Sequence, residues 1–328
     1  MAARLHPAPS QAEEIVDLRH LSARHLDALL AEEIRTWRTE LEWDFEKSAD
    51  LVRRFMDLRA LNGSALMEGG EVTGYTYYVL EDNKALIGDL YVRRAVCSAG
   101  RENQLLESVL SAVMSSPQIS RVECQLMMMQ TAGPRLLPRP NYLRTFERNF
   151  MRIDLRQARL EERKPRRPVS LERWSDLYQE AAAQLIAASY KGHIDGEIND
   201  QYRSAAGARR FLYNIVQYPG CGVFHRAGSY AAFAAGDGPA TGSLCGISLA
   251  SMVAAHCGHV TQICVSPEVR GTGVGYELLR QSLQSLHAAD CRSASLTVTA
   301  ANRDAVGLYE RVGFQTVRRF SACVWEGF

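Results

Sequence analysis

The residues of this chain best suited to chemistry lie in a glycine-rich loop at residues 270–275. In order they are Arg270, Gly271, Thr272, Gly273, Val274 and Gly275. An apolar run that ends at Val265 predicts a strand before the loop, and leucines at helical spacing predict a helix after it (Leu278, Leu279, Leu283 and Leu286). Backbone N–H groups at such a helix start face one point, and glycines let an anion approach them. The segment therefore predicts a phosphate-binding site, to which Arg270 can add a charge-assisted contact.

Three kinds of phosphate-binding loop have to be distinguished here. A P-loop would end in Gly-Lys-Ser or Gly-Lys-Thr, and no such triplet follows. A dinucleotide-binding loop would read GxGxxG with an acid at the end of the next strand, whereas this loop reads GxGxG and Asp290 precedes the next strand. The third kind, Arg/Gln-x-x-Gly-x-Gly/Ala, holds the pyrophosphate of coenzyme A, and residues 270–275 fit it position by position. This portion of the chain resembles the GNAT superfamily of N-acetyltransferases.

A second motif lies downstream of the loop. Asn302 stands where a predicted helix begins and Gly313 where it ends. On composition alone Tyr309 would be a core residue, because it shares one helical face with apolar residues (Ala305, Leu308 and Val312). The order Asn-x-x-Ala-x-x-x-Tyr-Glu-x-x-Gly-Phe, however, is similar to the second GNAT motif. That resemblance implies that Asn302 contacts the pantetheine arm and that the Tyr309 hydroxyl lies near the thioester sulfur.

The resemblance also implies roles in the reaction. Acyl transfer from a thioester to an amine passes through a tetrahedral oxyanion, which a fixed backbone N–H group stabilises. In this family the strand before the loop supplies that donor, which corresponds here to Cys264 or Val265. The leaving thiolate needs a proton, and Tyr309 can donate one because tyrosine stays protonated at neutral pH.

An amine acceptor arrives as an ammonium ion, so a group must remove a proton from it. His259 is the candidate base, because it lies upstream on the same strand, where GNAT relatives of the arylalkylamine type carry a histidine. Two alternatives stay open: His259 is merely hydrogen-bonded at a strand start, or Thr261 and Gln262 hold a water molecule that relays the proton. Residues 191–200 are acidic, and the resemblance places them at the acceptor pocket, where carboxylates would attract a cationic amine. A solvated loop is the other interpretation of that segment.

The order of predicted elements in the first half of the chain is repeated in the second. The offset is 265 − 92 = 173 for valines that end two strands and 278 − 105 = 173 for leucines of the two following helices. A nearly constant offset indicates an internal duplication. We predict a first domain at residues 1–157, a linker with solvated basic side chains at residues 158–168, and a second domain at residues 169–328. Ser170 is the predicted N-cap of the first helix in that second domain.

The specific motifs occur only in the second half. At the same offset the first half carries Cys97 opposite the loop arginine and Glu102 opposite the last loop glycine. It therefore lacks the cation and places a carboxylate where phosphate would approach, although Arg101 can offset part of that charge. Met129 stands opposite the motif asparagine, and prolines interrupt the region that follows it (Pro134, Pro138 and Pro140). We therefore predict one coenzyme A site per chain, in the second domain.

The composition of the 328 residues limits the class of protein. The hydrophobic fraction of 46% and the charged fraction of 23% are typical of a globular protein, and a net charge of +1 gives no support to a nucleic-acid or membrane-surface role. The start of the chain lacks the apolar core of a signal peptide.

Residues 238–267 carry no charged side chain and are long enough to cross a bilayer. Polar residues interrupt this stretch, so two central strands explain it better.

The eight cysteines form no CxxC pair, which predicts free thiols and a cytoplasmic location. His256 and His259 flank a Cys-Gly pair, but two histidines among scattered thiols do not make a zinc ligand set. We therefore expect no metal.

The predicted fold class is α/β (α+β), with two tandem GNAT-like domains, each a mixed, mostly antiparallel sheet flanked by helices. The predicted function is transfer of an acetyl group from acetyl-CoA to a primary amine of a small molecule or peptide, catalysed by the second domain. The tandem layout is similar to the mycothiol synthase type, so acetylation of an aminoglycoside is an alternative. A non-catalytic acyl-CoA sensor or interaction module is another, although it would be expected to have lost Asn302 or Tyr309. We expect neither a nucleic acid nor a membrane as partner, and the oligomeric state is left open.

Overall fold

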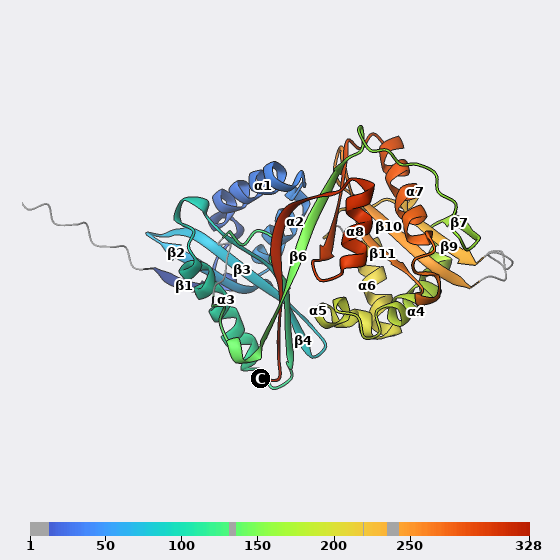
Figure 1. The fold of residues 1–328 in the computed structure, drawn as a ribbon. Coiled ribbons are helices and arrows are strands. Elements are labelled where there is room, and N and C mark those ends of the chain that lie inside the picture. Colours follow the sequence, from blue (N-terminus) through green and yellow to red (C-terminus); the bar gives the residue numbers. More distant parts are fainter. Residues whose placement is uncertain (1–12, 131–135, 219, 235–242) are drawn as a thin grey trace, which may run out of the picture. The chain divides into compact units, whose positions relative to one another are not determined.

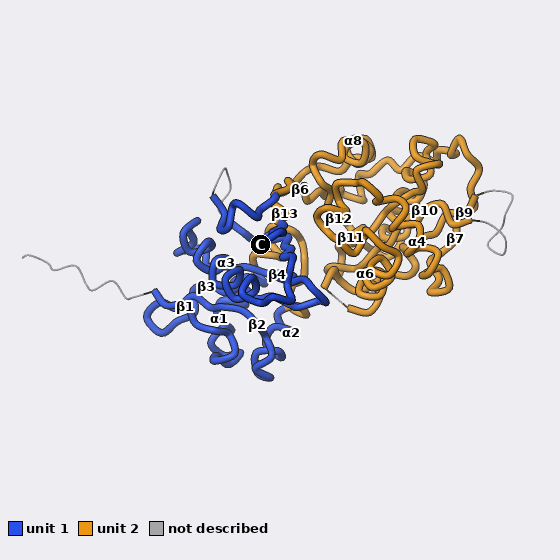
Figure 2. Tube along the Cα trace, turned by 90° about the horizontal axis from the view of Figure 1, so that it is seen from below, with its two compact units in different colours: residues 1–35, 49–144, 324–328 blue, residues 36–48, 145–323 orange. Residues whose placement is uncertain are grey.

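The computed structural model describes residues 13–130, 136–218, 220–234 and 243–328. The chain forms two compact units, which Figure 2 distinguishes by colour. Unit 1 comprises residues 1–35, 49–144 and 324–328, and unit 2 comprises residues 36–48 and 145–323. These bounds are not the predicted limits at residues 157 and 169, because the chain passes between the units several times. The domain limits drawn from the sequence stay a prediction.

In unit 1 the strands follow the order β1-β2-β3-β4-β5. Their bounds are β1 (Glu14–Asp17), β2 (Asn62–Glu68), β3 (Glu71–Glu81), β4 (Lys84–Val92) and β5 (Arg121–Gln125). Neighbouring strands are antiparallel except β4 and β5, which run parallel and are joined by helix α3 (Ala99–Met114). A parallel pair requires such a crossover, and α3 buries its leucine face against β2, β3 and β4. Two helices, α1 (Asp27–Leu41) and α2 (Glu46–Asp57), precede β2.

In unit 2 the strands follow the order β13-β6-β12-β11-β10-β9-β7, and the short β8 lies beside β10. Their bounds are β6 (Leu143–Asp154), β7 (Val169–Arg173), β8 (Val223–Phe224), β9 (Tyr230–Ala234), β10 (Leu244–Ala254), β11 (Cys257–Val265), β12 (Ser293–Thr299) and β13 (Gln315–Glu326). Strands β11 and β12 run parallel, whereas β12 with β6, β11 with β10, β10 with β9 and β9 with β7 are antiparallel. The predicted mixed, mostly antiparallel sheet is confirmed.

Helices cover both faces of the sheet in unit 2 (Figure 1). One face carries α7 (Val274–Ala288) and α8 (Arg303–Val312), and the other carries α4 (Gln179–Ser189) and α6 (Ala205–Gln217), with the short α5 (Asp195–Ile198) between them in sequence. The predicted helix start at Ser170 is wrong. Residues Val169–Arg173 form an edge strand instead, because they pair along their length with β9.

The uncharged stretch at residues 238–267 forms strands where the structure describes it. Residues 244–254 and 257–265 are β10 and β11, whose side chains are buried on both faces, as the apolar composition predicts. Within the described ranges, no helix combines the length and the apolar character needed to cross a membrane.

Both units carry the same irregularity at the same offset. In β4 the pairing with β3 skips Gly88, and in β11 the pairing with β10 skips Thr261, so each strand has a one-residue bulge (261 − 88 = 173). The parallel neighbour pairs only up to the residue before each bulge, Ile87 in β4 and Val260 in β11. The repeat predicted from the sequence is thus also a repeat of backbone geometry, and the tandem arrangement is confirmed.

The last strand of the first half, β6, belongs to unit 2, and the last strand of the second half, β13, ends in unit 1. In unit 2, β6 of the first half pairs with β12, with Phe150 opposite Thr297 and Asn149 opposite Val298. In unit 1, the final residues of the chain lie beside β5, where Glu326 pairs with Arg121 at 3.0 Å and the Trp325 indole donates to the Pro138 carbonyl at 2.9 Å. The two halves have therefore exchanged their closing strands, which the sequence pattern did not indicate.

Candidate active site

The predicted phosphate loop has the backbone of an anion site. Gly271 and Gly273 have φ values of +73° and +97°, where a residue with a Cβ is strained. Gly273 is the N-cap of α7, and no side chain among the described residues caps that terminus. The N–H groups of the first turn of α7 are therefore left for a ligand. A Cβ on Gly275 would meet its nearest neighbours at 3.9 and 4.0 Å, so the protein itself leaves room beside this residue.

Other side chains of the loop shape it. The Arg270 guanidinium donates to the Ser189 carbonyl at 2.6 Å, which holds it at the end of α4. The Thr272 hydroxyl donates to the Val269 carbonyl at 2.7 Å. Val274, the first residue of α7, is buried in a core cluster with Val269 and Leu278. The predicted linker packs on this loop, because the Arg166 N–H donates to the Thr272 carbonyl at 2.7 Å. Its basic side chains are exposed, as predicted.

The sheet opens beside the loop. Among the described residues, β11 pairs with β12 only through Cys257–Val260 and Ser293–Leu296, and beyond the bulge at Thr261 the two strands separate. The predicted backbone donors, Cys264 and Val265, lie in the part of β11 that β12 no longer covers. The Cys264 side chain packs in the core with α4 and α6, where burial raises its thiol pKa to about 12. The separation leaves one edge of β11 free to pair with an extended ligand.

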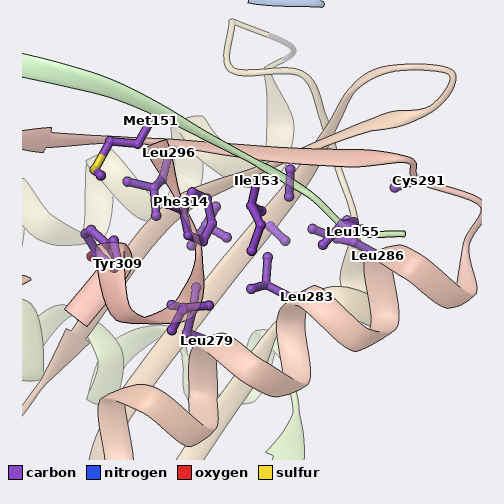
Figure 3. Close-up of a cluster of buried hydrophobic side chains, with 14 of the residues drawn as sticks. Met151, Ile153, Leu155, Leu279, Leu283, Leu286, Cys291, Leu296, Tyr309 and Phe314 are labelled. Atoms are coloured by element: carbon purple, nitrogen blue, oxygen red, sulfur yellow. The ribbon is translucent and has the colours of Figure 1, made fainter. Parts of the chain in front are cut away.

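The second motif forms α8 as predicted. The Asn302 side chain accepts from the Ala305 N–H at 3.3 Å and so caps the helix, and Gly313 ends it with φ +110°. Tyr309 is 6% exposed and lies at one end of a core cluster with Leu279 and Phe314 (Figure 3). Its hydroxyl has no hydrogen-bond partner within the described part of the chain. Burial, and then the charge of Asp195, raise its pKa well above the ordinary value, which keeps the phenol protonated.

A charged cluster lies on the opposite face of the sheet, at the same opening. The Arg148 guanidinium donates to Asp195 at 3.3 Å, to the Thr299 hydroxyl at 3.2 Å and to the Thr297 hydroxyl at 3.3 Å. Thr299 also donates to the Asp195 carboxylate. Asp195 belongs to the acidic segment expected at the acceptor pocket. Arg148 was not predicted, because it lies on β6, whose placement in unit 2 has no local signal in the sequence.

Two stacked tyrosines line the same region. Tyr190 and Tyr202 have ring centroids 4.6 Å apart, and Gln262 joins them by donating to the Tyr190 hydroxyl at 3.0 Å and accepting from the Tyr202 hydroxyl at 3.3 Å. Burial raises the pKa of both phenols, and the charge of Asp195 adds to the shift. Thr261 instead donates to Ser251 at 3.2 Å. A water relay at Thr261 and Gln262 stays a prediction.

His259 has surroundings that disfavour its charged form. It is 4% exposed, its Nδ1 lies 2.9 Å from the Ser295 hydroxyl, and its ring lies 5.0 Å from Trp43 and 6.3 Å from Phe150. Burial lowers its pKa to about 3. We therefore no longer expect it to titrate near neutral pH, as an ordinary histidine would, and its role as the base stays a prediction. Within the described residues, no three His, Cys, Asp or Glu side chains form a group that could hold a metal ion.

The equivalent helix start in unit 1 is occupied by the protein itself. Ser98 caps α3 by accepting from the Arg101 N–H at 3.3 Å, and the Arg101 guanidinium pairs with Glu13 and Glu68 instead of facing an open site. Glu102 is 1% exposed and accepts from the Gln130 N–H at 2.7 Å.

The region downstream of β5 in unit 1 also lacks the counterpart of α8. Where residues between β5 and β6 are described, they form a short 3-10 helix, Pro140–Tyr142, and no α-helix. The predicted interruption at Pro134 lies outside the described residues. These features support the prediction of one coenzyme site per chain.

Comparisons with known proteins point the same way. Residues 174–314 match the model of the acetyltransferase (GNAT) family. A Bacillus subtilis (strain 168) protein, whose proposed activity is alanine N-acetylation of ribosomal protein bS18, is 38% identical over 56 residues. That match covers 17% of this chain and 37% of the length of the relative.

Solved structures resemble the whole chain. A GCN5-related N-acetyltransferase from Sphaerobacter thermophilus gives a TM-score of 0.66 at 16% identity, with 96% of this chain and 95% of that chain covered. A tandem GNAT protein from the clavulanic acid biosynthesis pathway gives 0.56 at 18% identity, with 96% and 98% covered. At these identities the likeness shows the fold, including its tandem arrangement. On this evidence the chain has the tandem GNAT fold, and residues 174–314 match the GNAT acetyltransferase family.

Proposed function

We propose that unit 2 transfers an acetyl group from acetyl-CoA to the primary amine of a small molecule or a peptide. The observation that carries the proposal is the uncapped N-terminus of α7, which follows Gly271 and Gly273 and lies beside the strands that separate at Thr261. A helix start of this kind suits a pyrophosphate, and the free edge of β11 suits the amides of a pantetheine arm.

The described residues fit the coenzyme as follows. Backbone N–H groups of Gly271, Thr272, Gly273, Val274 and Gly275 would hold the phosphates, with Arg270 at the mouth of the loop. The backbone of Cys264 or Val265 would donate to the carbonyl oxygen of the acetyl group. Asn302 would contact the pantetheine through its amide NH₂, because its carbonyl oxygen caps α8. Bound acetyl-CoA would supply an activated acetyl thioester.

Tyr309 is the proposed general acid. Its raised pKa keeps the proton on the phenol at neutral pH, and its hydroxyl has no competing partner among the described residues. The tyrosine would give that proton to the coenzyme thiolate as the amide forms. The proton on the acceptor ammonium must leave beforehand, to water or to a base, and His259 stays the predicted candidate for that base.

For the acceptor we propose a chemical class, a primary amine, and no single compound. The Bacillus subtilis relative is named for the alanine of a ribosomal protein, which makes a peptide amino terminus one candidate beside polyamines, arylalkylamines and aminoglycosides. All eight cysteines are free thiols, which supports the further proposal of a reducing, cytoplasmic location.

The test is thiol release from acetyl-CoA by the full chain with spermidine, tryptamine, kanamycin and a peptide that begins with alanine. We expect release with at least one amine and none without an acceptor. The variant Arg270→Glu with Gly273→Glu is the matched control and should abolish release. Binding of acetyl-CoA without release of thiol for any acceptor would contradict the proposed enzymatic activity and favour a non-catalytic acyl-CoA sensor.

A further inference from the structure

The exchanged strand β6 brings an arginine into unit 2 at a functional position. Arg148 is 12% exposed and Asp195 14% exposed, and both lie where β11 and β12 have separated. Arg148 donates to one oxygen of the carboxylate, Oδ1, and the hydroxyl of Thr299 donates to the same oxygen. The other oxygen, Oδ2, lies 3.6 Å from Nδ1 of His193, beyond hydrogen-bond distance. Asp195 thus has one anchored oxygen and one that is available to a ligand.

The charge of Asp195 reaches the proposed reaction centre. Its negative charge helps to raise the pKa of Tyr190, Tyr202 and Tyr309, which lie in three different segments. The Arg148 guanidinium, which pairs with Asp195, lowers the pKa of Tyr202 and Tyr309 and so offsets part of this shift. A cation that approaches Tyr309 from the face that carries α4 and α6 therefore meets the Asp195 carboxylate together with its partner Arg148.

We propose that Asp195 binds the ammonium group of the acceptor and that Arg148, supplied by the last strand of the first half, is the positioning residue that holds Asp195. This inference rests on the proposed acetyl transfer and names the part of the acceptor that the site recognises, a cationic amine. Asp195 is the group that touches substrate, and Arg148 acts through it. The first half of the chain thus completes the acceptor site of the second.

The geometry of Arg148 favours this role over a purely structural ion pair. Its Nε is buried and has no acceptor within the described residues. The position of the guanidinium therefore leaves one of its N–H groups without a hydrogen bond to this part of the chain. Instead both terminal nitrogens are used, one on Asp195 and Thr299 and the other on Thr297. A buried donor left unsatisfied lowers stability, which indicates that the position of the carboxylate is what the arrangement maintains.

The experiment measures binding and catalysis separately in the full chain. Binding of spermidine, tryptamine and an alanine-first peptide with an amidated C-terminus is followed by calorimetry on the chain loaded with coenzyme A. Thiol release gives KM and kcat for the amine that binds best. The variants are Asp195→Asn, Arg148→Gln, the double variant and Arg148→Lys. Arg152→Gln is the matched control, because Arg152 lies on the same face of β6 and pairs with Glu42 at 3.2 Å, outside the cluster.

We expect Asp195→Asn to raise the Kd and KM of the amine by about 10- to 100-fold with coenzyme A affinity unchanged, as for loss of a charge-assisted hydrogen bond. Arg148→Gln should raise KM to a smaller extent, and Arg148→Lys should restore part of the loss. The double variant should match Asp195→Asn within about twofold, because Arg148 acts only through Asp195. Arg152→Gln should behave like the native chain.

Three results would overturn the inference while leaving coenzyme binding intact: no binding of any of these amines, an unchanged Kd in Asp195→Asn, or effects of the two single variants that multiply in the double variant. A structural ion pair would instead lower the unfolding temperature of Arg148→Gln without a change in the Kd of the amine. Failure of the native chain to bind coenzyme A would contradict the proposed function itself.

Discussion

Replacement of Gly275 by glutamate tests why only one half of the chain should bind coenzyme A. The substitution gives unit 2 the residue that unit 1 has at Glu102, in the first turn of the equivalent helix. A carboxylate about 4 Å from a phosphate charge costs about 4 kcal/mol at an effective dielectric of 20. That corresponds to roughly a thousandfold loss of affinity for coenzyme A.

Two further variants separate charge from volume. Gly275→Ala adds only a methyl group, whose nearest neighbours would be at 3.9 and 4.0 Å, and alanine also favours the helix by about 0.5–1 kcal/mol. It should therefore keep its affinity for coenzyme A and unfold at a slightly higher temperature. Gly275→Gln matches the volume of glutamate without its charge and should lose far less affinity than Gly275→Glu.

The assay is calorimetric titration with coenzyme A at two salt concentrations, together with thermal unfolding of each variant. The loss in Gly275→Glu should shrink at high salt, because part of the repulsion is screened. Equal losses in Gly275→Glu and Gly275→Gln would show that volume decides, and full affinity in Gly275→Glu would refute the position of the phosphate.

The remaining predictions concern stoichiometry, the proton donor and His259. Titration of the native chain should give one coenzyme A per chain, and a stoichiometry near two would show that unit 1 still binds it. Tyr309→Phe keeps the ring packing and should lower kcat by about 100-fold or more with little change in coenzyme affinity, so an unchanged kcat across the pH range would contradict its role as acid. The folded chain binds no proton at His259 from its unfolded pKa of 6.5 down to about 3, whereas the unfolded chain does. Stability should thus rise with pH across that window, by up to about 1.4 kcal/mol per pH unit. His259→Gln should flatten that part of the urea-midpoint profile and leave the pH dependence of kcat/KM above pH 6 unchanged; a flattened kcat/KM limb would instead restore the histidine as base.

Features that lie within one short segment could be predicted from the sequence. The loop from Arg270 to the start of α7 carries its own glycines with positive φ, and Asn302 and Gly313 cap a helix of ten residues that they themselves delimit. The uncharged stretch likewise contains the strands β10 and β11. Strands that are buried on both faces need an apolar composition, and that composition can be recognised in the sequence.

Features that depend on partners distant in sequence could not be predicted. The low pKa of His259 arises from burial beside Trp43, which is over 200 residues away in the chain, so a strand position alone suggested an ordinary histidine. The helix expected after Ser170 is a strand because of its pairing with β9, and the same local residues tolerate either structure. Strand exchange is the extreme case, because the pairing of β6 with β12 joins Asp154 to Ser293 and Arg148 to Thr299, which are far apart in the chain.

Strand exchange gives a physical reason why the first half persists without coenzyme-binding features. The edge of β12 that faces away from β11 is paired over seven residues with β6, from Ser293 opposite Asp154 to Thr299 opposite Arg148. Without the first half, these backbone groups would be unpaired, and buried unpaired groups of a strand are costly. Met151 and Ile153 would also be missing from the core under α7, and Arg148 from the side of Asp195. Loss of the loop arginine and gain of Glu102 leave β6 untouched, so substitutions that remove coenzyme binding from unit 1 are compatible with an intact acceptor site in unit 2.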